Sequence, residues 1–258
     1  MRYLMTLLVA NLLTLSAANL NMSAGGGIWN VASEGSIVET VNETLTVHDQ
    51  LYGKQNSGYL FAELRHPLPI LPNVRLEYCA QESQGEGKTV TLSTPFPGST
   101  TLSSAEVSSK LRIQQYDAVM FYRLLENVMW MSLDAGLDLK YVVSEYKVDT
   151  ISVDESSGSL TPLLYVRGRL DIPHTDLGVE TDMRYITDGS STLSDIKIKV
   201  DYTMTFIPVV HPIVEIGYRV ESFDIDGEES AIIGPIISGD TDVDLTFSGL
   251  YGGVSLAF

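Results

Sequence analysis

Residues 194–204 read SDIKIKVDYTM, in which apolar and polar side chains alternate position by position. In an extended chain Ile196 and Ile198 fall on one face, whereas Lys197 and Lys199 fall on the other. An α-helix would mix the two kinds of side chain on each face, because its period is 3.6 residues. The stretch therefore predicts a β-strand with one apolar and one charged face.

Nine other segments show the same alternation, and no segment has the pattern of a convincing amphipathic helix. The clearest of the nine is LDAGLDLKY at 133–141, where leucines alternate with aspartates and a lysine. The predicted strands cover 20–28, 58–66, 74–81, 118–124, 133–141, 164–172, 177–185, 194–204, 214–220 and 250–258. The sequence thus predicts an all-β protein with ten strands, or eight if two of the weaker segments are loops.

The connections between these segments alternate in length and composition. Short connections, mostly rich in proline, fall at 66–73, 125–129, 172–178 and 206–212. Longer acidic connections fall at 32–57, 82–115, 142–161 and 222–247, with a shorter one at 187–194. Short periplasmic turns and long outer loops are typical of a transmembrane antiparallel up-and-down β-barrel, and an even strand number leaves both termini periplasmic. A soluble β-sandwich would give no reason for this asymmetry.

The N-terminus predicts export. Arg2 precedes an apolar run over 4–15 and small residues at 16–18, which is the pattern of a secretory signal peptide cleaved after about residue 18. The apolar run is shorter than the ~20 residues of a membrane-spanning helix. Cys79 is the sole cysteine, so no internal disulfide holds the fold. We expect a signal peptide at 1–18 and a single β-barrel domain at 19–258, located in a bacterial outer membrane.

The charges on the predicted strands nearly cancel, although the chain carries a formal net charge of −17. The surplus acids fall in the connections, among them Asp195 and Asp224. Inside a narrow barrel opposite charges must pair across the strands, because an unpaired ion away from water is costly. We therefore expect an occluded lumen with a charge network. Its predicted members are Glu63, Arg65, Arg75, Glu77, Asp134, Asp138, Lys140, Arg167, Arg169, Asp171, Glu180, Asp182, Arg184, Lys197, Lys199, Asp201, Glu215 and Arg219.

Aromatic residues mark both ends of the apolar rows. Tyr78, Tyr141 and Tyr185 fall at the outer ends, and Tyr122 and Tyr202 fall at the inner ends. Two such girdles are expected where a barrel meets the two membrane interfaces.

The last predicted strand, LYGGVSLAF at 250–258, places an apolar row against lipid and ends on an aromatic ring. This row consists of Leu250, Val254, Leu256 and Phe258. Strands of this kind resemble the signal that the outer-membrane barrel-assembly machinery recognises. The expected partners are therefore that machinery, periplasmic chaperones, outer-membrane lipid and lipopolysaccharide.

Taken together, several segments resemble a family of small, uncharacterised proteobacterial outer-membrane β-barrel proteins. They are GYLFAELRHPLPILPNVRLEY at 58–78, DAVMFYRLLENVMWMSLDAGLDLKY at 117–141, TPLLYVRGRLDIPHTDLGVE at 161–180, LSDIKIKVDY at 193–202, VEIGYRVESFDID at 214–226 and GLYGGVSLAF at 249–258. The resemblance implies a barrel in the outer membrane. It carries no activity and no catalytic residues.

Candidate chemistry is sparse. His66, His174 and His211 lie in short turns and would bind a metal only if three separate turns converged. A hydrolytic site at the outer rim would have to use His48 with Asp49 or Asp224. We expect neither a catalytic site nor a cofactor, although the acidic loops could bind Mg²⁺ or Ca²⁺ shared with lipopolysaccharide phosphates. The acidic charge disfavours nucleic acid.

The expected function is therefore a non-enzymatic structural or surface-interaction role for an outer-membrane barrel with acidic loops. One alternative is a narrow selective channel for small solutes or ions, lined in part by Arg167, Arg169, Lys197 and Lys199. The other alternative is the rim enzyme at His48. The oligomeric state is left open.

Overall fold

The computed structural model describes residues 20–42, 45–68, 70–85, 89–92, 109–128, 130–148, 153–206, 209–226 and 241–258. All the regular structure in these residues is β. The strands are β1 (Asn21–Asn42), β2 (Leu45–Arg65), β3 (Asn73–Gly85), β4 (Thr89–Leu92), β5 (Ser109–Val128), β6 (Met131–Val148), β7 (Val153–Asp171), β8 (Leu177–Thr187), β9 (Thr192–Thr203), β10 (His211–Ile225) and β11 (Thr241–Ala257). No helix in the described part of the chain is long and apolar enough to cross a membrane.

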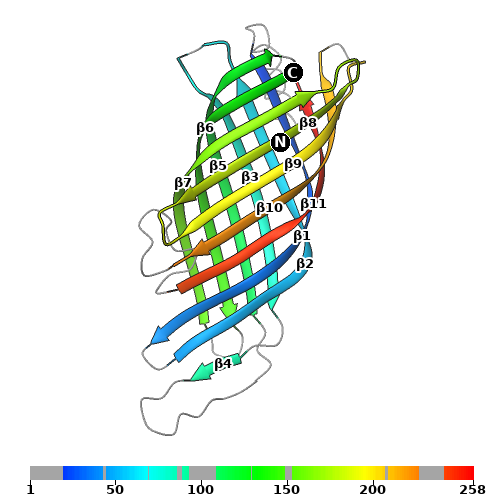
Figure 1. Cartoon of the computed structure of the whole chain (residues 1–258). Helices are drawn as coiled ribbons and strands as arrows, with labels where there is room; N and C mark the ends of the chain where they lie inside the picture. The colour runs from blue at the N-terminus through cyan, green and yellow to red at the C-terminus, as the bar shows by residue number, and fades with distance from the viewer. Residues whose placement is uncertain are drawn as a thin grey trace, which may run out of the picture.

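Ten of these strands form a closed antiparallel barrel, which confirms the predicted fold (Figure 1). Each strand pairs with its neighbours in chain order, and β1 closes the wall by pairing with both β11 and β2. The short strand β4 lies outside this ring and pairs only with Leu45–His48 of β2 in the described residues. Closure satisfies the backbone hydrogen bonds between strands, which is what permits a β-structure to cross lipid.

The two ends of the barrel differ. We call one the turn end, because it carries the short connections before β3, β6, β8 and β10 together with residues 21 and 258. The other is the hairpin end. There, the predicted loops 32–57 and 142–161 are wrong, because β1 and β2 stay paired up to Asn42↔Leu45 and β6 and β7 up to Val148↔Val153. Most of each segment is strand that continues the barrel wall.

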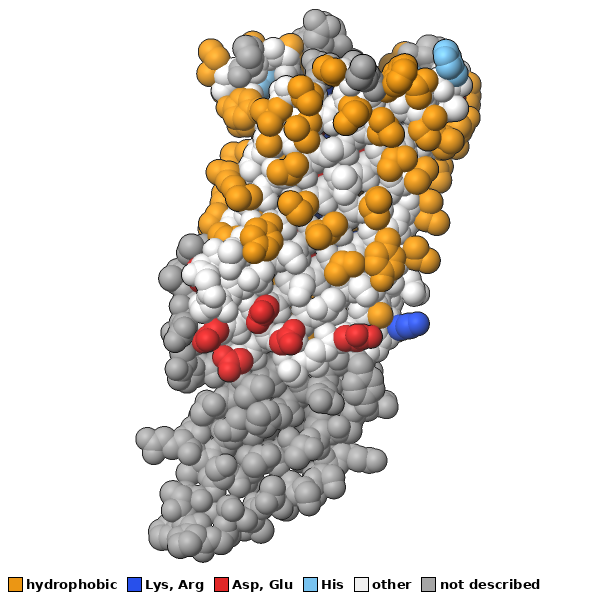
Figure 2. All heavy atoms as spheres, in the orientation of Figure 1, with side chains coloured by type: hydrophobic (Ala, Val, Ile, Leu, Met, Phe, Trp, Pro, Cys, Tyr) orange, Lys and Arg blue, Asp and Glu red, His pale blue; other side chains and the backbone are white. Residues whose placement is uncertain are grey.

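The outer face carries a broad apolar belt that begins at the turn end (Figure 2). Leu137, Ile198 and Leu250 are each at least half exposed on it, as the alternation predicts. Acidic side chains follow the belt toward the hairpin end in Figure 2. A row of contacting rings from Tyr78 to Tyr116 to Tyr141, with centroids 5.1 and 6.4 Å apart, crosses β3, β5 and β6.

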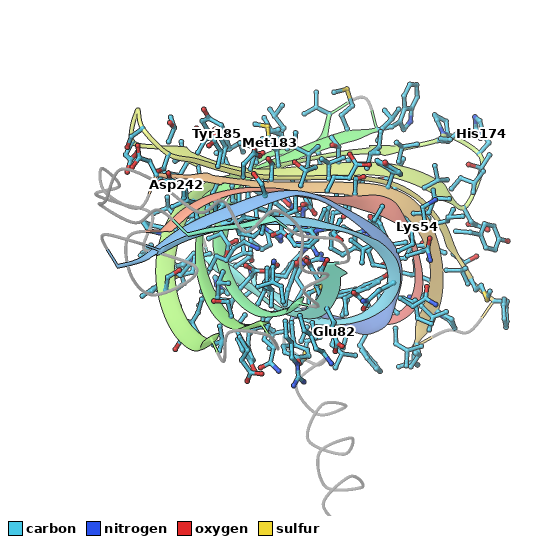
Figure 3. All side chains as sticks on the ribbon, turned by 90° about the horizontal axis from the view of Figure 1, so that it is seen from below. Lys54, Glu82, His174, Met183, Tyr185 and Asp242 are labelled. Atoms are coloured by element: carbon cyan, nitrogen blue, oxygen red, sulfur yellow. The ribbon has the colours of Figure 1, made fainter. Side chains whose placement is uncertain are left out.

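The interior is filled by side chains of two kinds (Figure 3). Charged residues occupy the lumen from the turn end to the middle. Toward the hairpin end, the inward rows become apolar and form an apolar plug. The plug consists of Trp29, Val31, Cys79, Leu111, Ile113, Val142, Leu163, Leu193, Phe223, Ile225, Val243, Leu245, Phe247 and Tyr251. Its core includes an edge-to-face contact between Phe223 and Phe247, with ring centroids 6.1 Å apart.

Candidate functional site

The candidate site is the charged lumen, to which each of the ten barrel strands except β1 and β11 contributes an ionisable side chain. Its cations are Arg65, Arg75, Arg123, Lys140, Arg167, Arg169, Arg184, Lys197, Lys199 and Arg219. Its carboxylates are Glu63, Glu77, Asp117, Asp134, Asp138, Asp171, Glu180, Asp182, Asp195, Asp201, Glu215 and Glu221. The carboxylates outnumber the cations, so they cannot all have a cation of their own.

The structure places all the predicted lumen residues on inward rows, with Asp171 exposed at the rim of the turn end. It also brings in residues outside the predicted set. Asp117 and Glu221 lie on the same inward rows and are buried. The assignment of Asp195 to a loop is wrong, because the hairpin before β9 is short and Asp195 is fully buried on the row of Lys197. The sequence could have placed Asp195 correctly, because residues two apart on a strand share a face and Asp195 lies two positions before Lys197.

Lys140 holds the cluster nearest the apolar plug. Its Nζ lies 3.0 Å from Asp117 Oδ1 and 3.0 Å from Glu221 Oε1, and the side chain is 0% exposed. Glu221 Oε2 also accepts hydrogen bonds from the amides of Gln81 and Gln115 at 3.0 and 2.9 Å. Lys140 and Glu221 are therefore matched, which offsets the cost of burying these ions away from water. Gln81 Oε1 and Asp117 Oδ1 are buried without a hydrogen bond of good geometry.

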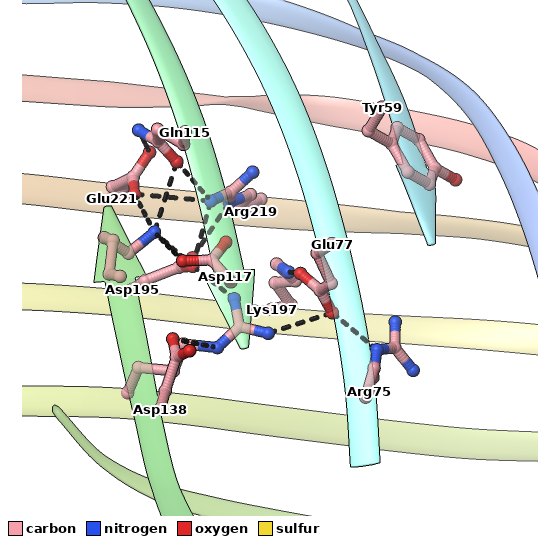
Figure 4. Close-up of polar contacts among 12 residues, drawn as sticks. Tyr59, Arg75, Glu77, Gln115, Asp117, Asp138, Asp195, Lys197, Arg219 and Glu221 are labelled. Atoms are coloured by element: carbon pink, nitrogen blue, oxygen red, sulfur yellow. Dashed lines mark hydrogen bonds and ion pairs between the residues drawn. The ribbon is translucent and has the colours of Figure 1, made fainter. Parts of the chain in front are cut away.

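The carboxylates Glu77, Asp138 and Asp195 face one another in the middle of the network (Figure 4), where Arg184 binds all three. The Arg184 guanidinium lies 2.9 Å from Glu77, 3.2 Å from Asp138 and 2.8 Å from Asp195. Lys197 binds the second oxygen of Glu77 at 2.7 Å. A guanidinium presents five N–H donors in a rigid fork, so one arginine can bind carboxylates from several strands.

Arg167 and Arg169 hold the part nearest the turn end. Arg167 donates to Glu63 at 2.7 Å and to Asp134 at 2.6 Å. Arg169 donates two hydrogen bonds to Asp201, at 2.7 and 3.0 Å. Arg167, Arg169, Glu63 and Asp201 line a cavity of about 370 Å³ that opens at the turn end.

Three of the buried ion pairs join strands that are not neighbours in the wall. Arg167 on β7 reaches Glu63 on β2, Arg184 on β8 reaches Glu77 on β3, and Lys140 on β6 reaches Glu221 on β10. The network therefore spans the lumen in addition to linking neighbouring strands along its wall. Ion pairs that cross the lumen can stabilise the barrel and block passage along its axis.

Aromatic side chains pack beside the network on the β1–β2–β11 side. Tyr59 donates to Glu215 at 2.7 Å and meets the ring of Tyr251 edge-on. Gly253 makes this packing possible, because a Cβ at that position would lie 2.2 Å from the Tyr59 hydroxyl oxygen. Arg219 lies over the ring of Trp29, with its Cζ 4.6 Å from the centroid, in cation–π geometry.

The histidines do not form a site in the residues that the structure describes. His66 accepts from the backbone N–H of Leu68 and contacts the carbonyl of Pro72 at 3.0 Å, which fixes its own turn. His174 is a turn residue with φ of 63°, and His211 lies at the turn-end cavity. No cluster of three or more metal-binding side chains occurs in the described ranges. The side chains of His48 and Asp49 lie outside the described part.

The terminal strand has the geometry that its sequence predicts. Leu250, Val254 and Leu256 point outward and are exposed, and Phe258 exchanges backbone hydrogen bonds with Met22 of β1. The predicted lipid-facing row is therefore part of the apolar belt.

Comparison with known proteins bears on the fold. No model of a known protein family matches the chain. No curated protein sequence matches it either. Among solved structures, the outer membrane protease OmpT from Escherichia coli matches with a TM-score of 0.51 at 11% identity, over 92% of this chain and 97% of OmpT. The attachment invasion locus protein Ail of Yersinia pestis matches with a TM-score of 0.36 at 10% identity, over 93% of this chain and 99% of that protein. The fold of the chain is that of the bacterial outer-membrane β-barrels.

Proposed function

We propose that the protein is an integral outer-membrane barrel that does not conduct along its axis and that serves a structural or surface-interaction role. The observation that carries this proposal is the cross-lumen network, in which Arg167, Arg184 and Lys140 each bind carboxylates of distant strands. The apolar plug forms a second barrier in series. Barrels of about this size are generally filled by side chains, whereas open channels have ~16 strands or more.

The proposed setting is a bacterial outer membrane with the hairpin end outside and the turn end in the periplasm. The apolar belt supports contact with lipid and lipopolysaccharide. Residues 1–18 would be the signal peptide. Periplasmic chaperones and the barrel-assembly machinery would bind the unfolded chain, with the row from Leu250 to Phe258 as the recognition signal.

The hairpin end is the proposed interaction surface. Asp224, Asp242 and Asp244 are exposed there on β10 and β11, beyond the apolar belt. A surface of this charge favours partners that are cationic or that share a divalent cation with it. The role we propose is non-enzymatic and requires no resident cofactor.

Planar-bilayer conductance of the refolded protein tests the proposal, with heat-modifiable gel mobility confirming that the barrel has formed. The expected result is a folded barrel without discrete current steps. Salt-dependent steps that change in Arg167→Ala or Lys199→Ala would instead establish the narrow selective channel. Hydrolysis of a peptide or ester substrate that is lost in His48→Ala would establish the rim enzyme.

A further inference from the structure

The wall of the barrel is incompletely paired between β2 and β3. In the described residues their ladder runs from Leu64↔Val74 to Tyr59↔Cys79 and ends there. Beyond it, residues 49–58 of β2 and 80–85 of β3 are not paired with each other, although each strand keeps its other neighbour; β2 then pairs with β4 through Leu45–His48. We call this unpaired stretch the β2–β3 gap. It begins beside Tyr78, in the aromatic row at the edge of the apolar belt.

Side chains at the edges of the gap turn away from it. Continuing the register would place Asn56 opposite Glu82, yet Asn56 accepts from Asn30 on β1 at 2.8 Å and Glu82 pairs with Lys110 on β5 at 2.5 Å. Figure 3 shows Lys54 of β2 and Glu82 of β3 at separate places on the rim. The outward side chains at the two edges therefore interact with β1 and with β5, and not with each other across the gap.

A small cavity lies behind the start of the gap. It is lined by Leu60 and Tyr78, which face outward, and by inward residues that include Trp29, Cys79 and Tyr251. Residues of both faces thus line the cavity at the last paired positions of the ladder, Leu60↔Tyr78 and Tyr59↔Cys79. The cavity volume of about 30 Å³ is room for a group about the size of two water molecules.

Asp182 lines this cavity and makes no salt bridge in the described residues. Arg184, two positions along the same strand, interacts with it electrostatically, but the guanidinium of Arg184 binds Glu77, Asp138 and Asp195. Asp182 is 4% exposed, and its Oδ1 is buried without a hydrogen-bond partner. The two cations directly across on neighbouring strands, Arg167 and Lys197, are engaged elsewhere, with Glu63 and Asp134 and with Glu77. The other carboxylates of the cavity, Glu77, Glu180 and Glu215, are each ion-paired.

A buried carboxylate in this state requires a donor or a cation in order to stay ionised. The surrounding rings of Trp29, Tyr59 and Tyr251 present aromatic surface, which favours a cation bearing carbon over a strongly hydrated metal ion. We propose that the β2–β3 gap is a lateral entrance and that Asp182 binds a primary ammonium group arriving through it. The group could belong to a free small amine or to a lipid headgroup at the membrane interface.

Cys79 allows a direct test, because it is the sole cysteine and lines the same cavity. Two methanethiosulfonate reagents of similar size, one carrying an ethylammonium and the other an ethylsulfonate, are reacted with the folded barrel in phosphatidylcholine vesicles. Each rate is divided by the rate for the unfolded protein. We expect the cationic reagent to be favoured about tenfold, and Asp182→Asn to abolish that preference. Asp171→Asn, which removes a carboxylate at the turn end, is the matched control and should leave it unchanged.

A second variant tests the route. Gly58 faces outward at the edge of the gap, and a Cβ there would meet no atom within 4 Å, so Gly58→Trp can cover the gap without a clash. Both reagents should then react at least tenfold more slowly. Equal rates in Gly58→Trp and wild type, or no charge preference in wild type, would overturn the proposal.

Protection of Cys79 separates the two sources of the ammonium. Slower labelling in phosphatidylethanolamine vesicles than in phosphatidylcholine vesicles would identify a lipid headgroup, and slower labelling with added methylammonium would identify a free amine. Protection by sodium ions equal to that by methylammonium, or protection by none of these, would overturn the assignment. The readout does not depend on whether the axis conducts.

Discussion

Replacing Lys140 with methionine should destabilise the folded barrel by about 3–5 kcal/mol. The side chain is fully buried, and its ammonium is the partner of Asp117 and Glu221 at 3.0 Å each. Glu221 would keep Arg219 at 3.3 Å and two amide donors. Asp117 would lose its salt bridge, so most of the cost should arise from that one uncompensated carboxylate.

The double variant Lys140→Met with Asp117→Leu should therefore recover stability, with a coupling of about 2 kcal/mol between the two sites. Urea unfolding of the refolded barrel in detergent, followed by tryptophan fluorescence and by gel mobility, measures all the variants. Lys110→Met is the control, because Lys110 is half exposed and its pair with Glu82 should contribute less than about 1 kcal/mol. If Lys140→Met costs no more than Lys110→Met, or the double variant costs the sum of the singles, the network does not stabilise the barrel as described.

Three further variants probe other parts of the molecule. Gly253→Ala should lower the yield of folded barrel on gels, because its Cβ would lie 2.2 Å from the Tyr59 hydroxyl, whereas Gly252→Ala, with no atom nearer than 3.5 Å, should fold normally. Phe223→Ala should cost about 3–5 kcal/mol in urea unfolding by leaving a cavity against Phe247, and a cost below 1 kcal/mol would show that the plug is loosely packed. Ile198→Lys should cost about 2–4 kcal/mol in lipid vesicles if the belt faces lipid, whereas a neutral result would place that face in water.

The strands and their inward and outward faces could be predicted from the sequence, because one physical rule holds along most of the barrel wall. Within lipid, apolar side chains face out and charged ones face in, so the alternation around Lys197 and Lys199 predicts both. Beyond the belt the rule inverts. Phe223 and Leu245 face inward there, and Asp224 and Asp244 face outward. The acids made these stretches resemble loops, although the period of two continued.

The sequence predicts which charged residues enter the lumen, but it does not predict which of them pair with each other. Inward rows identify which charges enter the lumen, as for Arg167 and Glu63. Their pairing across the lumen depends on how the cylinder flattens and tilts, which no local pattern encodes. The lack of a salt bridge at Asp182 and the early end of the β2–β3 ladder depend on how other residues choose their partners, so neither could be predicted from the sequence.

The pairing of β1 with β11 has a kinetic consequence. It joins segments far apart along the chain, as in the hydrogen bond from Trp29 to the carbonyl of Gly249 across 220 positions. Contacts of such long range are slow to form because the intervening chain must first be ordered. Until they form, the edges of β1 and β11 stay open as templates for strands of other chains. Closure is thus the step at which folding and aggregation compete most directly.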